Sequence, residues 1–345
     1  MLQEARAKKL LSEVESTGRL VENKLLRCVS KPVRLTRTLK SVVRYALPDI
    51  GFRIRPFLIR AAYEGLGRQF SDVLTVCAGI ELLQASTLVI DDVFDESPMR
   101  NAKPSIFGKW GAKRAFAAGT FMSAEALALV AQALAQSKQL QNHFRVVVLL
   151  QRTHSAIYAG QFADVDYAGR TSVSESDYTS MISATTGEFI KASLVIGGVL
   201  RGASPRVISI LKKAGRDLGL AYQLRDDVID LIGDPKCTGK PLAGDVRERK
   251  MRLPVIHALE KLRGRNRGRL ASLYRSGRSL TNAEVREVLD LLDGVGAVGY
   301  AISRTKELCS NAARAARQLP GSERLLANRL LAVADLISNF EGEKG

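Results

Sequence analysis

Residues 82–104 read LLQASTLVIDDVFDESPMRNAKP, and this stretch decides the fold that we expect. The segment 80–90 is largely apolar and contains neither glycine nor proline, so it predicts a helix. Asp91, Asp92 and Asp95 come next, and positions i and i+4 are neighbours on a helix surface. Pro98 lacks a backbone N–H and restricts the residue before it, so we expect it to end the helix.

The same acidic spacing occurs a second time in the chain. Asp226, Asp227 and Asp230 lie in AYQLRDDVIDLIGD, again after an apolar segment. A single cluster of this kind is also compatible with a solvated acidic helix end. Hard divalent cations take oxygen ligands, and Mg²⁺ is typically held by one or two carboxylates together with substrate phosphates. Two acidic helix faces therefore favour a metal site in which the carboxylates flank a cavity.

The two clusters, in DDVFDESPMR and QLRDDVIDLIGDPKCTGK, resemble the aspartate-rich motifs of the trans-isoprenyl diphosphate synthases, or polyprenyl synthetases. The resemblance covers residues 50–254 and includes GFRIRP, GQFADV, TTGEF and GKPLAGDVRERKMRLP in the same order. It implies an all-α fold, a single large helical bundle of the isoprenoid synthase type with a central cavity. One domain would span 1–345, with N-terminal helices in 1–48, the catalytic motifs in 50–254 and C-terminal helices in 255–345.

The expected elements follow from apolar periodicity and from the positions of proline and glycine. Residues 1–48 predict one or two amphipathic helices broken at Pro32 and Pro48, and Ser71 is expected to cap the helix that carries the first cluster. Three or four helices should follow Pro254, with Thr281 starting one and Ser322 capping the last. The remaining expected segments are a helix continuing over Phe57–Gly65, helices Ala112–Ala135, Phe144–Asp166, Ser174–Leu200 and Pro205–Ile232, and loops Glu96–Gly111 and Asp234–Asp245.

The composition indicates a globular chain without a metal-binding or disulfide framework of cysteines. Of 345 residues, 46% are hydrophobic and 25% are charged. The four cysteines and three histidines are scattered, which argues against zinc and disulfides and favours a reducing cytoplasm. The charged N-terminus is not typical of a signal peptide. The segment Ala115–Ala135 is long enough to span a membrane, but Glu125 lies in its middle, so we expect a buried core helix.

The net charge of +17 is unevenly distributed. Residues 261–278 carry seven basic side chains and no acidic one. A solvated surface, an anionic lipid surface, nucleic acid and an acidic partner are the alternatives that such charge leaves open. No nucleic-acid motif accompanies the charge, so we expect no nucleic-acid partner. The expected location is the cytoplasm, with peripheral contact to an anionic membrane as the alternative.

The resemblance implies ionisation of an allylic diphosphate with the help of Mg²⁺, three ions per site, with Mn²⁺ as an alternative. The ion acts as a Lewis acid that stabilises the negative charge on the leaving diphosphate. Asp91, Asp95 and Asp226 are the preferred ligands. The other implied ligands or water-holding residues are Asp92, Asp227, Asp230 and Asp245.

Further residues are assigned to the allylic diphosphate by the same resemblance. Cationic groups form charge-assisted hydrogen bonds to phosphate, which are stronger than neutral ones. Arg100, Lys240 and Lys250 would supply them. The remaining assigned residues are Gln223 and Thr186 as hydrogen-bond partners, Gln161 and Asp164 beside the metal ligands, and Thr185, which stands where the family has lysine.

The expected site for the second substrate, isopentenyl diphosphate, departs from the family pattern. Arg55 and Gln84 match that pattern, but Phe52 and Asn101 replace an expected lysine and arginine. Two lost charged hydrogen bonds would cost roughly 3–6 kcal/mol. The candidates for compensation are Arg53, Lys103 and Arg114.

Small residues precede the first acidic cluster where, by the resemblance, a bulky aromatic would limit the length of the prenyl chain. These are Ser86 and Thr87, which predict a deep pocket for a farnesyl or geranylgeranyl chain. Alternatively, Phe116 or Phe121 supplies the floor of this pocket from another helix.

Three functions remain open at this point. The first is a prenyltransferase that condenses an allylic diphosphate with isopentenyl diphosphate to a farnesyl, geranylgeranyl or longer product. The second is a class I terpene cyclase on the same scaffold, which needs no isopentenyl diphosphate. The third is a non-catalytic subunit of a heteromeric synthase. Because both acidic clusters are complete, we do not expect the non-catalytic subunit. The activity usual in the family that the chain resembles favours the prenyltransferase over the cyclase, and the resemblance implies a homodimer.

Overall fold

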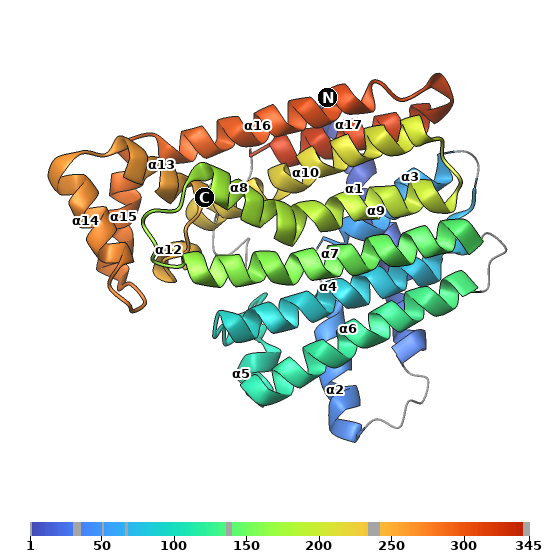
Figure 1. Ribbon diagram of the computed structural model, residues 1–345, viewed down its shortest axis with the longest axis horizontal. Helices are drawn as coiled ribbons and strands as arrows, with labels where there is room; N and C mark the ends of the chain where they lie inside the picture. The colour runs from blue at the N-terminus through green and yellow to red at the C-terminus, as the bar shows by residue number, and fades with distance from the viewer. Residues whose placement is uncertain are drawn as a thin grey trace. The chain divides into compact units, whose positions relative to one another are not determined.

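The computed structural model describes residues 2–29, 36–49, 52–65, 68–135, 140–233 and 242–340. Within these ranges the regular structure is helical except for two antiparallel strands of two residues each, β1 (Met99–Arg100) and β2 (Lys103–Pro104) (Figure 1). The prediction of an all-α chain is confirmed. The chain forms two compact units, and the assignment of 1–345 to one domain stays a prediction.

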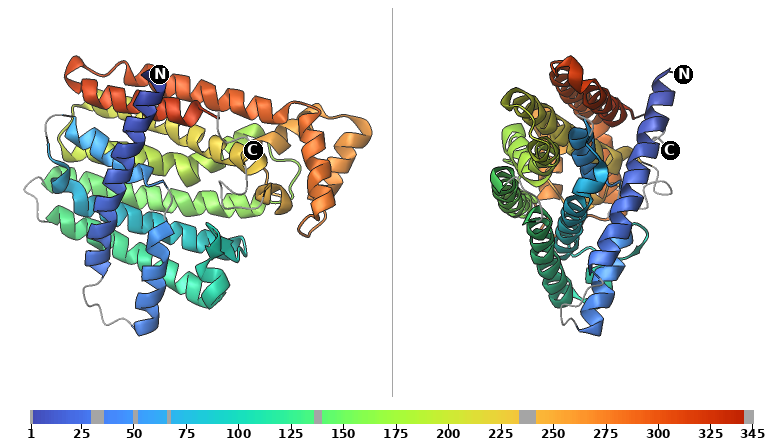
Figure 2. Two further views of the ribbon diagram at one scale, coloured as in Figure 1. Left: turned by 180° about the vertical axis from the view of Figure 1, so that it is seen from behind. Right: turned by 90° about the vertical axis from the view of Figure 1, so that its right-hand side faces the viewer.

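The first unit comprises residues 1–153, 190–215 and 315–333. It begins with α1 (Leu2–Val29), α2 (Arg37–Ala46), the 3₁₀ turn η1 (Leu47–Asp49) and α3 (Ile54–Glu64). The two N-terminal helices were predicted, and η1 contains Pro48, whereas Pro32 lies outside the described residues. The long helix α1 crosses the other helices of its unit (Figure 2) and packs against α3 and α4, with Val21 and Leu25 fully buried.

Helix α4 (Leu74–Phe94) carries the first acidic cluster. Its predicted start was wrong, because Ser71 lies in the 3₁₀ turn η2 (Phe70–Val73) and does not cap α4. The helix also ends before Pro98, with Asp95 as the C-cap. Glu96, directly after this C-cap, has a positive φ of 48°, which ends the helix. The hairpin β1–β2 follows, and its turn residues Asn101 and Ala102 also have positive φ. This hairpin fills part of the predicted loop.

The rest of that predicted loop is helical. Helix α5 (Ile106–Trp110) begins where the Ser105 hydroxyl accepts a hydrogen bond from Gly108 N. The prediction of a loop over Glu96–Gly111 is therefore wrong in part. A polar N-cap residue such as Ser105 can start a single helical turn even in a segment rich in proline and glycine.

Helix α6 (Ala112–Ala135) has the predicted bounds and packs along α4 (Figure 1). The two backbones approach closely, since a Cβ atom on Gly79 would lie 2.5 Å from Val130 Cγ2 and 3.0 Å from Ala126 O. Two segments, 70–94 and 112–135, are long and apolar enough to cross a membrane, and 72% and 39% of their most apolar windows are buried. The prediction of a buried core helix is thus confirmed for only one face of α6; Phe116 is half exposed on another.

The first unit is completed by parts of α7 (Leu140–Tyr167), α9 (Glu188–Leu200), α10 (Pro205–Ile232) and α17 (Arg324–Ser338). A buried pair links two of these segments, since Arg201 donates two hydrogen bonds of 2.8 Å to Glu323. Glu323 lies in the 3₁₀ turn η4 (Gly321–Glu323) before α17. The same turn contains Ser322, so the prediction that Ser322 caps the last helix is wrong.

The second unit comprises residues 154–189, 216–314 and 334–345. It contains the remaining parts of α7, α10 and α17, the short helix α12 (Gly244–Arg247), and four helices toward the C-terminus. These are α13 (Leu253–Lys261), α14 (Gly264–Tyr274), α15 (Asn282–Asp293) and most of α16 (Ala297–Ala316). Pro254 lies in the first turn of α13, and the described residues beyond α13 form four α-helices, α14 to α17, which is within the predicted range. The predicted start of α15 is confirmed, because Thr281 and Glu284 form a capping box.

The predicted helix Ser174–Leu200 is continuous but not uniform. It consists of α8 (Glu175–Ile182), a π-helical segment η3 (Ser183–Gly187) and α9. Ser174 caps it through a capping box with Asp177. Segments of π-helix insert one residue into a turn and often occur at functional sites. Here the segment contains Thr185 and Thr186, two of the residues assigned to the allylic diphosphate.

Candidate active site

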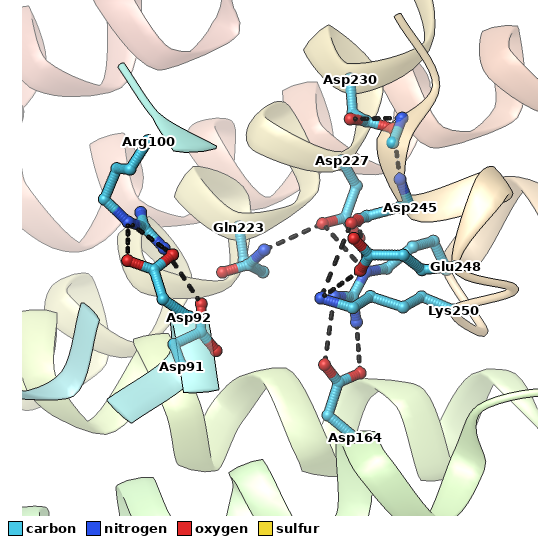
Figure 3. A network of polar contacts seen from close by, with 12 residues as sticks. Asp91, Asp92, Arg100, Asp164, Gln223, Asp227, Asp230, Asp245, Glu248 and Lys250 are labelled. Carbon is cyan, nitrogen blue, oxygen red and sulfur yellow. Dashed lines mark hydrogen bonds and ion pairs between the residues drawn. The ribbon is translucent and has the colours of Figure 1, made fainter. Parts of the chain in front are cut away.

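The first acidic cluster lies in the last turn of α4, and Arg100 on β1 pairs with it (Figure 3). The Arg100 Nη2 atom lies 2.7 Å from Asp92 Oδ1 and 3.5 Å from Asp91 Oδ2. Asp92 is buried, whereas Asp91 and Asp95 are partly exposed. In this structure Arg100 pairs with the carboxylates, and its assignment to the diphosphate stays a prediction. The exposed oxygens of Asp91 and Asp95 are therefore the better placed for an ion.

A small pocket lies beside this cluster, between α2, α4 and the hairpin. Tyr45 forms one side of it, and its ring contacts Lys103 and Lys109, whose Nζ atoms lie 4.3 and 4.2 Å from the ring centroid. Burial lowers the pKa of Lys103, and the nearby positive charge of Lys109 lowers it further. The pocket is lined by Tyr45, Ala46, Ala85, Leu88, Val89, Asp92, Arg100, Lys103, Pro104, Ser105 and Ile106. An anion entering this pocket would meet one lysine, Lys103, and one arginine, Arg100.

The residues after Gly51 carry the departures that the sequence showed. Phe52 is 39% exposed and supplies no charge. Arg53 has a positive φ of 50° and points inward: its Nη2 atom lies 3.1 Å from both Glu22 Oε2 and Leu47 O. Arg53 therefore does not compensate for the lost lysine. Arg114 is exposed on α6.

Below the acidic cluster, α4 contains a buried carboxyl group, Glu81, one turn before Gln84. Its Oε2 atom lies 3.8 Å from Arg53 Nη1 and accepts no hydrogen bond. Burial raises the pKa of Glu81 to about 7, although the charges of Arg53 and Arg55 lower it. Gln84 is also buried. Sequence reasoning missed Glu81, because the sequence of an apolar helix does not show whether a glutamate in it is buried or which cation lies near it.

Ser86 and Thr87, the predicted pocket residues, both bond to the backbone of their own helix. Ser86 donates to Leu83 O (2.6 Å) and is fully buried, and Thr87 donates to Gln84 O (2.9 Å) and is half-buried. Ser86 lies at the contact with α6, because a Cβ atom on Gly119 would lie 3.3 Å from Ser86 O. Phe116 is half exposed, so it does not form a buried floor within this chain.

The second acidic cluster lies at the end of α10 and has three different environments. Asp226 is exposed. Asp227 is buried and accepts hydrogen bonds from Tyr178 OH (2.5 Å) and Gln223 Nε2 (2.9 Å), and burial raises its pKa to about 7. Asp230 accepts from the backbone N–H groups of Gly244 and Asp245, both at 3.1 Å. The cluster therefore binds its own loop as well as presenting one exposed carboxylate.

Two of the assigned residues, Gln223 and Thr186, form a hydrogen-bond chain to Asp227. Gln223 accepts a hydrogen bond of 2.6 Å from the Thr186 hydroxyl, while Thr185 donates to Met181 O within its own helix. The Gln161 Nε2 atom is buried and makes no hydrogen bond. Lys250 Nζ lies 3.3 Å from Glu248 and 3.9 Å from Asp245. Lys240 lies outside the described residues.

The structure adds a cation that the sequence did not single out. Arg252 precedes α13 and pairs with Asp164, with Nη1 2.5 Å from Oδ1, and with Asp245, with Nε 2.7 Å from Oδ2. Asp164 was predicted to lie beside the metal ligands. One arginine in a strongly basic chain carries no local signal, so sequence reasoning could not separate it from surface arginines.

The donor set fits a hard divalent cation. Both clusters offer carboxylate oxygens, and each contains an exposed or partly exposed member, Asp91 and Asp226. Among the described residues, no three His, Cys, Asp or Glu side chains converge on a ready-made ion site. Mg²⁺ does not require one, since it is commonly bound by one or two carboxylates and completes its shell with water and substrate phosphates.

Comparison with known proteins agrees with this geometry. The fold matches that of isoprenoid synthases: geranylgeranyl pyrophosphate synthetase from Pyrococcus horikoshii superposes with a TM-score of 0.86 at 28% identity, covering 97% of this chain and 99% of that one. The family model described as polyprenyl synthetase matches residues 36–292, and the chain belongs to this family of trans-isoprenyl diphosphate synthases.

Two further proteins extend the comparison. A short chain isoprenyl diphosphate synthase from Methanothermobacter thermautotrophicus is 33% identical over 251 residues, which cover 73% of this chain and 75% of that protein. A polyprenyl synthase from Caulobacter crescentus, solved with calcium and isoprenyl diphosphate, has the same fold with a TM-score of 0.83 at 24% identity, covering 97% of each chain.

Proposed function

We propose that this protein is a prenyltransferase that condenses an allylic prenyl diphosphate with isopentenyl diphosphate. The observation that carries this function is the presence of both complete aspartate motifs, on α4 and α10, in a chain that matches the polyprenyl synthetase model over residues 36–292. Members of this family use divalent metals with diphosphate substrates. The described side chains supply the oxygen donors and cations that such substrates need.

The reaction breaks the allylic C–O bond, forms a C–C bond to isopentenyl diphosphate and releases diphosphate and a proton. We assign Mg²⁺, three ions per site, to Asp91, Asp95 and Asp226, with Mn²⁺ as a substitute. When bound, these ions neutralise the charge that builds up on the leaving diphosphate. Gln223 and Thr186 hold Asp227 in position, and Lys250 is the described cation that we assign to the diphosphate.

The acceptor diphosphate needs cations that Phe52 and Asn101 do not supply. Lys103 lines the pocket beside Asp92 and donates one hydrogen bond of 3.3 Å to Tyr45 O, whereas Arg53 Nη2 is bonded to both Glu22 and Leu47 O. We therefore assign Lys103, together with Arg55 and Gln84, to isopentenyl diphosphate. Lys103→Gln should raise the Michaelis constant for isopentenyl diphosphate about tenfold, since one charged hydrogen bond is lost. An unchanged constant would exclude Lys103 from acceptor binding.

The small Ser86 and Thr87 support a product of farnesyl to geranylgeranyl length or longer, and the relatives described above include a short chain isoprenyl diphosphate synthase and a geranylgeranyl pyrophosphate synthetase. We also propose a homodimer, because exposed apolar side chains occur along α6 and α7, among them Phe116 and Phe144. A cytoplasmic location is proposed from the scattered cysteines. The +17 charge supports transient contact with an anionic membrane.

One incubation tests the function. Purified protein with Mg²⁺ receives geranyl, farnesyl or geranylgeranyl diphosphate, with and without isopentenyl diphosphate, and the products are separated by chain length. Longer diphosphates that form only with isopentenyl diphosphate are expected. Hydrocarbons or alcohols formed without it would indicate a terpene cyclase, and no product under any condition would indicate a non-catalytic subunit.

A further inference from the structure

The guanidinium of Arg252 lies among three carboxylates that come from three helices. It contacts both oxygens of Asp164 on α7 (2.5 and 3.2 Å) and donates from Nε to Asp245 on α12 (2.7 Å). The same Nε atom lies 3.8 Å from Asp227 on α10. The side chain of Arg252 is 11% exposed. Figure 3 shows the three carboxylates around this network of contacts.

Three carboxylates in one place repel one another unless a cation lies between them. A guanidinium remains charged at any ordinary pH and matches a carboxylate with two parallel hydrogen bonds. Removing one partner of a buried ion pair destabilises a protein strongly, because the other charge stays buried without compensation. Arg252 therefore stabilises this part of the second unit without any bound metal.

Two of the three carboxylates around Arg252 are ones that an ion would need. Asp227 and Asp245 were predicted as metal ligands, and Arg252 Nε lies against one oxygen of each. Asp227 also accepts hydrogen bonds from Tyr178 and Gln223, so both of its carboxylate oxygens have partners. A divalent ion that binds these carboxylates must displace the guanidinium or share an oxygen with it, and the two positive charges repel.

We propose that Arg252 is a positioning residue that holds Asp164, Asp227 and Asp245 together before an ion binds and weakens the binding of a divalent ion that arrives without diphosphate. This inference rests on the proposed function. A diphosphate brings its own oxygen ligands, so an ion that arrives with it needs fewer of the carboxylates that Arg252 holds. The second cluster is then filled by metal and substrate together.

The test compares the full-length protein with its Arg252→Gln variant, both carrying Asp91→Asn and Asp95→Asn to remove the first cluster. Mn²⁺ binding without diphosphate is titrated at pH 8 by the electron paramagnetic resonance signal of the free ion. The variant should bind Mn²⁺ about tenfold more tightly, because the ion no longer has to break a charged hydrogen bond. Without metal, the variant should melt at a lower temperature, and Mn²⁺ should raise its melting temperature more than that of the protein with Arg252.

The matched control is Arg247→Gln in the same background. Arg247 lies on α12 and bonds to Leu280 O and Asn282, and to no carboxylate that the proposal uses. The Arg247→Gln substitution removes the same charge as Arg252→Gln and should leave the Mn²⁺ affinity unchanged. The inference would be overturned if Arg252→Gln bound Mn²⁺ no more tightly than the control does. It would also be overturned if, without metal, Arg252→Gln melted at the same temperature as the parent.

If Arg252→Gln does not fold, Arg252→Lys decides. It keeps the positive charge but loses the two-pronged contact with Asp164, so its Mn²⁺ affinity should stay within about twofold of the parent while its melting temperature falls. A gain of about tenfold in affinity or an unchanged melting temperature contradicts the proposal. Absence of Mn²⁺ binding in both parent and variant, even when diphosphate is added, overturns the second cluster as a metal site of the proposed function as well, whereas equal affinities overturn only the role of Arg252.

Discussion

The folded protein should become less stable as the pH rises, because Glu81 ionises, and the Glu81→Gln variant should not show this decrease. Glu81 is fully buried on α4, its Oε2 atom accepts no hydrogen bond, and its pKa is raised from 4.5 to about 7. A carboxyl group whose pKa is higher in the folded state stabilises that state below the pKa of the unfolded chain. This contribution is lost between pH 4.5 and pH 7.

The magnitude follows from the difference between the two pKa values. Each pKa unit corresponds to about 1.4 kcal/mol, so ionisation of Glu81 costs the folded state about 3 kcal/mol once the pH exceeds 7. Between pH 5 and pH 8 the difference in unfolding free energy between Glu81→Gln and wild type should therefore grow by about 2 kcal/mol in favour of the variant. Arg53 is bonded to Glu22 and Leu47 O as well, and we expect these bonds to persist in the variant.

Urea unfolding followed by circular dichroism at pH 5 and pH 8 measures this difference, because other groups that titrate in this range cancel between the two proteins. Glu22→Gln is the matched control: it removes the more exposed carboxylate that pairs with Arg53 and should keep the loss of stability at pH 8. A stability difference between Glu81→Gln and wild type that is the same at both pH values would refute the reasoning, since Glu81 would then already be ionised at pH 5.

Three further predictions concern the reaction. Asp91→Ala or Asp226→Ala should abolish turnover and leave the circular dichroism spectrum unchanged; near-native activity at saturating Mg²⁺ would show that these carboxylates do not bind the metal. Thr87→Phe should shorten the longest product, because the half-buried side chain precedes the first cluster by one turn, and an unchanged product length places the floor elsewhere. The double variant Phe52→Lys, Asn101→Arg should lower the Michaelis constant for isopentenyl diphosphate; failure to do so would mean that side chains at positions 52 and 101 do not reach the acceptor diphosphate.

Much of the helical structure could be predicted from the sequence, because each helix depends on residues within a few turns. The bounds of α6 and α10 were predicted correctly, since apolar periodicity runs through both and Pro205 marks the start of α10. The predictions failed at short elements. The hairpin after α4 depends on positive-φ turn residues and the helix α5 on a single cap, which periodicity does not report.

The candidate site divides in the same way. The sequence by itself determined which carboxylates form two clusters and which family they indicate, because helical spacing alone puts Asp91 and Asp95 on one face. Only the tertiary structure decided which of these carboxylates are buried and what neutralises them. Asp164 and Arg252 are 88 residues apart, and Asp227 and Tyr178 are 49 apart. A buried charge is stabilised by whichever partner the packing brings to it, and that partner follows no local spacing in the chain.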